Sequence, residues 1–341
     1  MIVIFHVQQF TFRGTESALF DYAHYNEVLL HNKSIVVAPI STQKLNQSEI
    51  VKKFEDRFPV YFYTSFHDLV DQTSLENMCL TLKGDVLYMM KHGNLEDDVI
   101  QSIPTVFHCV FSTNSPRGIV YAGVSESVSQ GKFPFVHHIV EFNNPISDEG
   151  KTFRKQLNIP DDAIVFGRHG GSDTFDLIDA KHVILGILKN DVKKRIYFLF
   201  AVRPLIFKDV NEEEFGGRLL FMNAFTDPRI KQRFIQTCDA MIHACSLGES
   251  FGISVLEFAY FNKPVITWSG GSLHKQHLTN LGEKALIYHN TVELYQFLAH
   301  LDDVKKEKDD PEFWKIRCFT PENIMKKFDE VFLAPIRNLK K

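Results

Sequence analysis

The sequence predicts an α/β protein built from two doubly wound domains. Short apolar runs recur along the 341 residues, and segments long enough to form a helix separate them. Runs rich in Val, Ile, Leu and Phe that alternate with helices are typical of parallel strands buried on both faces of a sheet. Six such runs lie in each half of the chain, and at about 150 residues per domain the length also fits two domains.

The predicted strands follow one another at similar intervals. In the first half they are Ile2–His6, Ser34–Ala38, Val60–Tyr63, Val86–Met90, Thr105–Phe111 and His138–Phe142. In the second half they are Ala163–Gly167, Ile196–Ala201, Arg218–Met222, Ala240–Ala244, Pro264–Trp268 and Ala285–Tyr288. The polar, turn-rich segment Phe142–Gly150 separates the halves. We therefore place a first domain at residues 1–145 and a second at residues 150–319.

A helix is expected at the end of the chain, over residues 320–341. Thr320 suits the N-cap and Pro321 the first helical position. An apolar face follows, formed by Ile324, Phe328, Val331 and Phe332. We expect this face to return to the first domain; packing on the second domain is the alternative.

Composition excludes several classes of partner. The net charge of −4 offers no basic field for nucleic acid or an anionic membrane. No apolar run approaches the length of about 18 residues that a membrane span requires, and the apolar first residues suit a strand better than a signal peptide. The five cysteines are scattered without a Cys-x-x-Cys pair, which fits a reducing, cytoplasmic location.

The most informative stretch holds two carboxylates, Glu249 and Glu257, eight positions apart. Ser250, Phe251 and Gly252 form a turn after the first. A helix that starts near residue 250 points free backbone N–H groups, with the positive end of its dipole, at whatever precedes it. Such an end is an anion site suited to a diphosphate. If helical geometry holds between them, the carboxylates lie about 12 Å apart along the axis.

Glu257 is unusual because its helical neighbours are apolar. They include Ile253, Leu256, Phe258 and Phe261. Burying an unpaired carboxylate costs several kcal/mol, so Glu257 needs a partner. That partner is a ligand, or else Glu257 forms a structural salt bridge or lies on a partly exposed helix edge.

Other candidate residues follow predicted strands, where ligands of doubly wound folds bind, here in the cleft between two domains. Arg168 precedes Gly170 and Gly171 at the end of a strand, and a guanidinium is a permanent bidentate donor to phosphate. Gly14, after the first strand, would allow close approach of the backbone to a ligand. His108 lies near the end of another strand. The alternatives are a surface turn for Arg168, a structural glycine for Gly14, and a core histidine with satisfied hydrogen bonds for His108.

No metal site is predicted. His274 and His277 have helical spacing and His137 is followed by His138, but neither pair has a matching Cys, Asp or His set. No Asp-x-Asp follows a strand, and the acidic run of residues 212–214 fits a solvated loop.

These residues resemble the retaining glycosyltransferases of family 4, which adopt the GT-B fold. The similarity is strongest over Phe221–Leu281, where three segments follow the family's order and spacing: Cys238–Ala244, Glu249–Glu257 and Asn262–Thr267. The chain looks particularly like a branch encoded by large DNA viruses of algae and by some bacteria. Arg168-x-Gly170-Gly171 and the run Asp173–Asp176 mark that branch.

The resemblance implies a metal-independent, retaining transfer of a sugar from a nucleotide-diphosphate sugar, with GDP or UDP as the nucleotide, to a hydroxyl of a glycan or glycoprotein. It implies no other cofactor, and a location in the host cytoplasm if the chain is viral. Glu249 would contact donor-sugar hydroxyls, His108 would lie nearby, and Glu257 would hold the ribose. The remaining donor-binding residues would be Gly14, Thr15, Arg168, Gly170, Gly171, Arg203, Met222, Phe225, Ser250, Phe251, Gly252 and Ile253.

Two departures from the family pattern matter. The lysine that usually follows the arginine is absent, with Asp173 or Thr174 in its region, and Arg203 is our candidate replacement. His243 and Ala244 stand where many members have Pro-Ser. Two alternatives stay open, a nucleotide-sugar epimerase on the same architecture and a binding protein without turnover. A nicotinamide dehydrogenase is disfavoured because the chain has no Gly-x-Gly-x-x-Gly.

Overall fold

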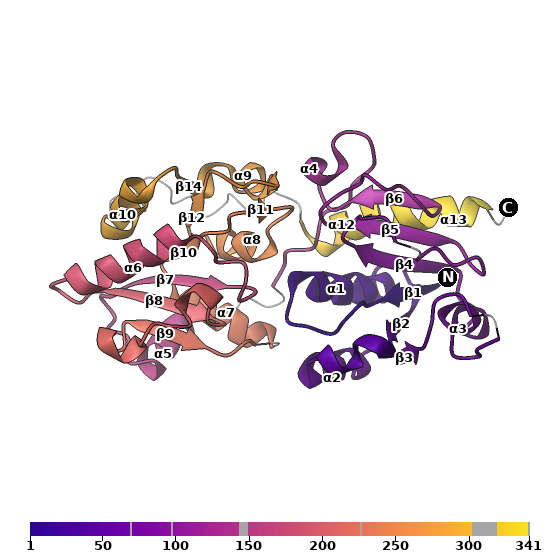
Figure 1. The fold of residues 1–341 in the computed structure, drawn as a ribbon, viewed down its shortest axis with the longest axis horizontal. Helices are drawn as coiled ribbons and strands as arrows, with labels where there is room; N and C mark the ends of the chain where they lie inside the picture. Colours follow the sequence, from indigo (N-terminus) through magenta and orange to yellow (C-terminus); the bar gives the residue numbers. More distant parts are fainter. Residues whose placement is uncertain (69, 97, 143–148, 226, 302–318, 340–341) are drawn as a thin grey trace. The chain divides into compact units, whose positions relative to one another are not determined.

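The computed structural model describes residues 1–68, 70–96, 98–142, 149–225, 227–301 and 319–339 (Figure 1). The chain divides into two compact units. Unit 1 comprises Met1–Ile139 and Phe319–Lys341, and unit 2 comprises Val140–Cys318. Residues 143–148, which include the domain end predicted at 145, lie outside the described residues.

Unit 1 contains a six-stranded parallel sheet in the order β3-β2-β1-β4-β5-β6. Its strands are β1 (Ile2–His6), β2 (Lys33–Pro39), β3 (Val60–Tyr63), β4 (Val86–Lys91), β5 (Thr105–Cys109) and β6 (Val120–Gly123). Five of these match predicted runs. The sixth prediction, His138–Phe142, is wrong, because that segment is not a strand. The sixth strand is β6, which the sequence analysis missed because its four residues follow Gly118 and contain only one Val.

The helices of unit 1 come from both ends of the chain. Those of the first part are α1 (Gly14–Val28), α2 (Ser48–Glu55), α3 (Leu75–Thr81) and α4 (Glu126–Ser129), with a 3-10 turn at Ile40–Leu45. The last segment forms α12 (Pro321–Phe328), a π-helical turn (Asp329–Leu333) and α13 (Ala334–Leu339). The predicted apolar face, Ile324, Phe328, Val331 and Phe332, is buried in unit 1, where the Phe328 ring stacks on Tyr22 with centroids 5.2 Å apart.

Unit 2 contains a second six-stranded parallel sheet, in the order β14-β12-β10-β7-β8-β9. Its strands are β7 (Ile164–His169), β8 (Ile196–Ala201), β9 (Leu219–Met222), β10 (Ala240–His243), β12 (Val265–Trp268) and β14 (Ala285–Tyr288). All six lie on predicted runs. A separate two-stranded ladder joins β11 (Gly248–Glu249) to β13 (His274–Lys275).

Helices connect these strands. They are α5 (Glu149–Gln156), α6 (Ile178–Asn190), α7 (Pro228–Thr237), α8 (Ile253–Tyr260), α9 (Gln276–Leu281) and α10 (Thr291–Ala299), with 3-10 turns at Leu205–Phe207, Glu212–Phe215 and Gly282–Lys284. Within the described ranges, no helix is both long and apolar enough to cross a membrane.

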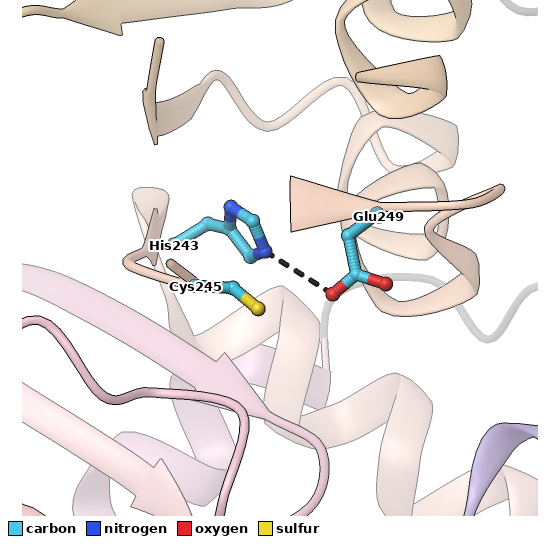
Figure 2. Close-up of side chains that lie close together, drawn as sticks. All are labelled: His243, Cys245 and Glu249. Atoms are coloured by element: carbon cyan, nitrogen blue, oxygen red, sulfur yellow. Dashed lines mark hydrogen bonds and ion pairs between the residues drawn. The ribbon is translucent and has the colours of Figure 1, made fainter. Parts of the chain in front are cut away.

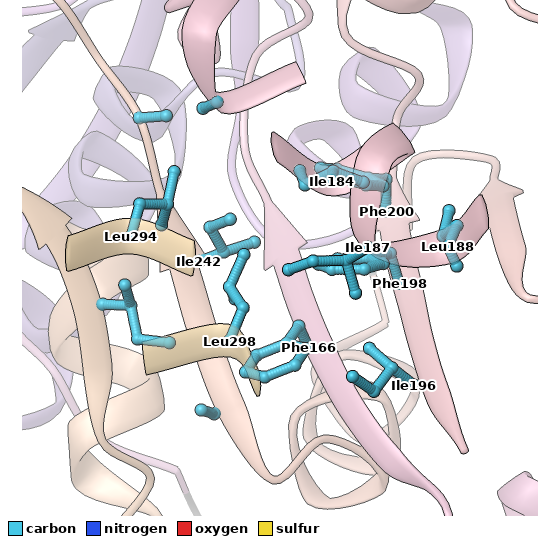
Figure 3. Packing of buried hydrophobic residues seen from close by; sticks show 14 of the residues in the cluster. Phe166, Ile184, Ile187, Leu188, Ile196, Phe198, Phe200, Ile242, Leu294 and Leu298 are labelled. Carbon is cyan, nitrogen blue, oxygen red and sulfur yellow. The ribbon is translucent and has the colours of Figure 1, made fainter. Parts of the chain in front are cut away.

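The alternation of side chains along β7 divides the core of unit 2 into two faces. Phe166 belongs to a cluster that includes Ile184 of α6 and Leu298 of α10 (Figure 3). Gly167 faces the other way, because a Cβ built there meets Cys238 Sγ at 2.2 Å and Phe258 Cζ of α8 at 3.1 Å. The predicted α/β class with two doubly wound sheets is therefore confirmed.

Candidate active site

The strand order of unit 2 defines one preferred place for a ligand. The chain begins the sheet at β7, adds β8 and β9 on one side, and then starts β10 on the other side of β7. Ligands of doubly wound sheets bind outside the carboxyl ends of the strands at such a reversal. Arg168 and His169 end β7 there, and His243 ends β10. We call the side chains at this point the switch-point cluster: Arg168, His169, Lys231, His243, Cys245, Glu249 and Glu257.

Glu249 lies just beyond β10, on β11. Its position is fixed by a parallel ladder in which Glu249 is paired with Lys275. The Glu249 side chain is 26% exposed, and its Oε1 lies 3.2 Å from His243 Nε2 (Figure 2). Because Glu249 belongs to a strand, the helical spacing assumed between the two carboxylates is wrong for residues 249–252.

The following helix, α8, begins at Ile253, three residues after the start predicted at residue 250. Gly252 is its N-cap and has a φ of +88°, in the left-handed region that favours glycine. A Cβ at Gly252 would lie 2.6 Å from Val255 Cγ2 and 2.9 Å from His277 Cβ. Ser250 and Phe251 therefore precede the helix, and its free first-turn N–H groups belong to residues 253–255.

Arg168 is buried, with 2% of its surface exposed. Its guanidinium donates to the carbonyl oxygens of Gly170 (3.3 Å) and Gly171 (2.6 Å) and to Thr174 Oγ1 (2.5 Å). Burial lowers the pKa of Arg168 to about 10, while nearby Glu249 opposes this shift. The guanidinium therefore stays charged at neutral pH, but its N–H groups donate to oxygens of the loop that follows β7.

Glu257 shows the ion pair that the sequence analysis named as an alternative. The residue is 6% exposed; Oε1 contacts Lys231 Nζ, and Oε2 lies 3.0 Å from His169 Nε2. Burial alone would raise the pKa of Glu257, but Lys231 and His169 outweigh it and lower the pKa to about 2. An ionised carboxylate has about four acceptor sites, so these two partners leave it capacity for a ligand hydroxyl.

Arg203, predicted as the second phosphate cation, already has partners within unit 2, and its role stays a prediction. Arg203 forms an ion pair with Glu212, and its guanidinium lies 4.1 Å from the centroid of the Phe221 ring. The backbone of Met222, a donor-binding residue implied by the resemblance, is also partly used, because its carbonyl accepts the N–H of Val202 at 2.9 Å.

Phe225 lies beside the switch-point cluster. Its ring centroid is 6.3 Å from that of His169 and 5.4 Å from that of Phe234 on α7. The aromatic side chain of Phe225 therefore borders the cluster.

His108, predicted to lie near the donor sugar, is fully buried in unit 1, and its catalytic role stays a prediction. Nε2 lies 2.8 Å from the Val136 carbonyl and Nδ1 lies 2.6 Å from the Tyr88 hydroxyl. A carbonyl only accepts, so Nε2 carries the proton and Nδ1 accepts from Tyr88. Burial lowers the pKa of His108 to about 3, so the ring is neutral and both nitrogens are occupied.

Gly14 and Thr15 also belong to unit 1. They begin α1, and Thr15 Oγ1 donates to Glu16 Oε2 at 2.8 Å. Their role in holding a donor stays a prediction.

Sequence reasoning missed four members of the switch-point cluster: His169, Lys231, His243 and Cys245. His169 and His243 end strands and were open to the same positional argument as Arg168. Lys231, on α7, carries no sequence signal, because only the packing of α7 beside α8 brings it to Glu257.

Comparison with known proteins identifies the fold. No protein-family profile and no curated protein sequence matches the chain. Among solved structures, HepE (Alr3699) of Anabaena in complex with UDP and glucose is similar with a TM-score of 0.72 and 14% identity, over 97% of this chain and 99% of that one. A glycosyltransferase of Rickettsia africae ESF-5 gives a TM-score of 0.74 and 13% identity over 99% of both chains. WaaG, a glycosyltransferase involved in lipopolysaccharide biosynthesis, gives 0.65 and 11% identity over 97% of this chain and 100% of that one. At these identities the likeness shows the fold alone: the chain has the GT-B fold of these glycosyltransferases.

Proposed function

We propose that the chain is a glycosyltransferase that moves a sugar from a nucleotide-diphosphate sugar to an acceptor hydroxyl. The observation that carries the proposal is the meeting of Arg168, Glu249 and the N-terminus of α8 at the switch point of unit 2. The structural likeness supports it, since HepE has been solved with UDP-glucose, at a TM-score of 0.65 and 12% identity to this chain. UDP is therefore the first nucleotide to test, and GDP the second.

In this proposal the leaving diphosphate lies before Ile253. The free N–H groups and dipole of α8 stabilise its negative charge there. Arg168 adds a permanent charge, and the phosphate oxygens replace the carbonyls of Gly170 and Gly171 as its acceptors. The guanidinium and the oriented N–H groups of α8 together stabilise the developing charge, so in this proposal they take the place of a metal.

In this proposal two carboxylates bind different parts of the donor. Glu249, 26% exposed, accepts hydrogen bonds from hydroxyls of the donor sugar. Glu257 uses its remaining acceptor sites for the ribose, and its ion pair holds Lys231 near the phosphates. Lys231 rather than Arg203 thus supplies the second cation. Retention of anomeric configuration and a glycan or glycoprotein acceptor follow from the resemblance to family 4.

The decisive experiment replaces Glu249 with Gln, which keeps the shape of the side chain but removes its charge. We expect Glu249→Gln to lower the rate of transfer and of donor hydrolysis by at least about a hundredfold, the cost of removing one well-placed polar group from a transition state. Glu214→Gln, an exposed carboxylate in the same unit, is the matched control and keeps full activity.

The assay measures released nucleotide with and without acceptor sugars, and circular dichroism checks that both variants fold. A folded Glu249→Gln protein with full activity would contradict the proposal. Conversion of the donor sugar without acceptor, and without release of nucleotide, would identify an epimerase instead. Tight donor binding with no nucleotide released under any acceptor would identify a binding protein.

A further inference from the structure

Three side chains with metal-binding atoms converge at the end of β10 (Figure 2). His243 is the last residue of the strand, Cys245 follows in the loop, and Glu249 lies on β11. One ligand atom from each, an imidazole nitrogen, the thiol sulfur and a carboxylate oxygen, lies within 4.8 Å of the other two. His243 and Cys245 are buried, whereas Glu249 is partly exposed, which leaves this side open for an ion to enter.

The surroundings orient His243 as they do for a metal ligand. Sheet register places His243 beside Thr267 of β12, and Nδ1 lies 2.9 Å from Thr267 Oγ1. Histidine ligands almost always donate their second ring N–H to such a neighbour, which fixes the tautomer. When Nδ1 donates to Thr267, the lone pair of Nε2 points at the Glu249 carboxylate 3.2 Å away. In the other tautomer the Thr267 hydroxyl donates to Nδ1 and Nε2–H donates to Glu249, so a bound cation would take the place of that proton.

We propose that His243, Cys245 and Glu249 bind a borderline-soft divalent ion of the Zn²⁺ class. Such an ion takes imidazole, thiolate and carboxylate ligands at about 2.0–2.3 Å, and tetrahedral geometry places those ligands roughly 3.5 Å apart. The His243–Glu249 pair already has this spacing, and the atoms of the cluster need to close by little more than about 1 Å. On binding, the Cys245 thiol releases its proton to solvent and water completes the coordination. Mg²⁺ and Ca²⁺ prefer oxygen ligands and do not fit this set.

The site has a consequence for activity that rests on the proposed function. Glu249 cannot hold a metal ion and sugar hydroxyls at once, so zinc inhibits transfer and competes with the donor. The positive charge of Arg168 acts on both Glu249 and Cys245. Because Arg168 and the metal ion are both positive, they repel each other. We therefore expect the site to bind Zn²⁺ less tightly than a structural zinc site does, and chelators to remove the ion. Zn²⁺ would therefore inhibit, reversibly, a transfer reaction that itself needs no metal.

Titration of the full chain with Co²⁺ tests the site without any assay of activity. Tetrahedral Co²⁺ bound to a thiolate gives a near-ultraviolet sulfur-to-metal band and strong visible bands. We expect these bands to saturate at one equivalent in the wild type, to disappear with Zn²⁺, and to persist in excess Mg²⁺. Cys245→Ser removes the sulfur band.

Two control variants separate this thiol from the others. Cys238→Ser replaces another buried thiol of the same unit, whose Sγ contacts the Phe234 carbonyl at 3.2 Å, with a group that keeps this hydrogen bond. Cys318→Ser removes a thiol outside the described residues. Both are expected to keep the bands. A folded wild type without the bands, or bands that survive in Cys245→Ser, would overturn the proposal.

A competition experiment separates the metal site from the proposed function. We expect UDP-sugars or GDP-sugars, whichever bind, to raise the Co²⁺ concentration needed for half saturation. In the transfer assay, we expect Zn²⁺ to inhibit the wild type at least tenfold more strongly than Cys245→Ser. If no nucleotide sugar weakens the Co²⁺ bands, the result supports the metal site. It would, however, overturn the proposal that the metal ion and the donor sugar both bind Glu249. Absence of transfer under all conditions bears on the proposed function alone.

Discussion

At the scale of single residues, burial decides which polar side chains remain available to a ligand. His108 lies near the end of β5 and Glu249 lies just beyond β10, yet both ring nitrogens of His108 are occupied in a buried core, whereas Glu249 is a quarter exposed and contacts His243. A buried polar group must find partners within the fold. Position at the end of a strand is therefore not sufficient evidence of function.

The competing candidates for the second phosphate cation yield a residue-scale prediction. We expect Lys231→Met to raise the donor dissociation constant about tenfold, because it removes a charge held beside His169 and Glu257. Arg203→Met should change it less than twofold, since Arg203 is not part of the switch-point cluster and pairs with Glu212. Calorimetric titration with UDP or GDP measures both. The reverse order of effects would restore Arg203 as the phosphate ligand.

The Glu257 ion pair predicts a pH dependence of stability. The folded-state pKa, about 2, lies below the unfolded value of 4.5. The stabilisation is therefore fully present above pH 4.5 and is lost as the pH falls towards 2. The shift corresponds to about 3 kcal/mol.

Glu257→Gln should accordingly be less stable than the wild type at pH 7. We expect the difference in melting temperature to stay constant down to about pH 4.5 and to shrink below it. Scanning calorimetry of both proteins across this range provides the check. A difference that grows on acidification would show that the ion pair does not stabilise the fold.

At the scale of elements, a single backbone conformation sets where α8 begins and so where its N–H groups point. We expect Gly252→Ala to destabilise unit 2 by about 1–3 kcal/mol, through left-handed strain and the contacts of the new Cβ with Val255 and His277. Donor affinity should fall with it, because the helix start shifts.

Gly186→Ala is the matched control for this substitution. Gly186 lies inside α6, and a Cβ there meets nothing within 4 Å. Alanine should therefore stabilise the protein by about 0.5–1 kcal/mol. Thermal unfolding of the two variants measures both effects, and equal effects in the two variants would argue against a special role of the Gly252 conformation.

At the scale of the whole molecule, the end of the chain completes the core of its beginning. Phe328 of α12 is fully buried in unit 1, where it packs against Tyr22 and Tyr88 with ring centroids 5.2 Å away in each case. Phe328→Ala removes a large buried side chain, and we expect it to cost about 3–5 kcal/mol. Differential scanning calorimetry measures the loss.

The exposed face of the same segment offers a control for this prediction. Lys327→Ala, one residue earlier on the solvent side, should change the stability by less than about 0.5 kcal/mol. If Phe328→Ala proves equally mild, the C-terminal segment contributes little to the stability of unit 1.

The sequence by itself determined the α/β class, eleven of the strand positions and three residues of the switch-point cluster, Arg168, Glu249 and Glu257, because buried parallel strands and strand-end motifs leave local patterns of apolar residues, glycine and arginine. It did not determine β6, the start of α8 or the partners of the charged groups. Those depend on which segments pack together: α7 beside α8 brings Lys231 to Glu257, and the loop after β10 brings Cys245 to Glu249. Such contacts join residues distant in the sequence or depend on the exact course of a loop, and only the tertiary structure decided them.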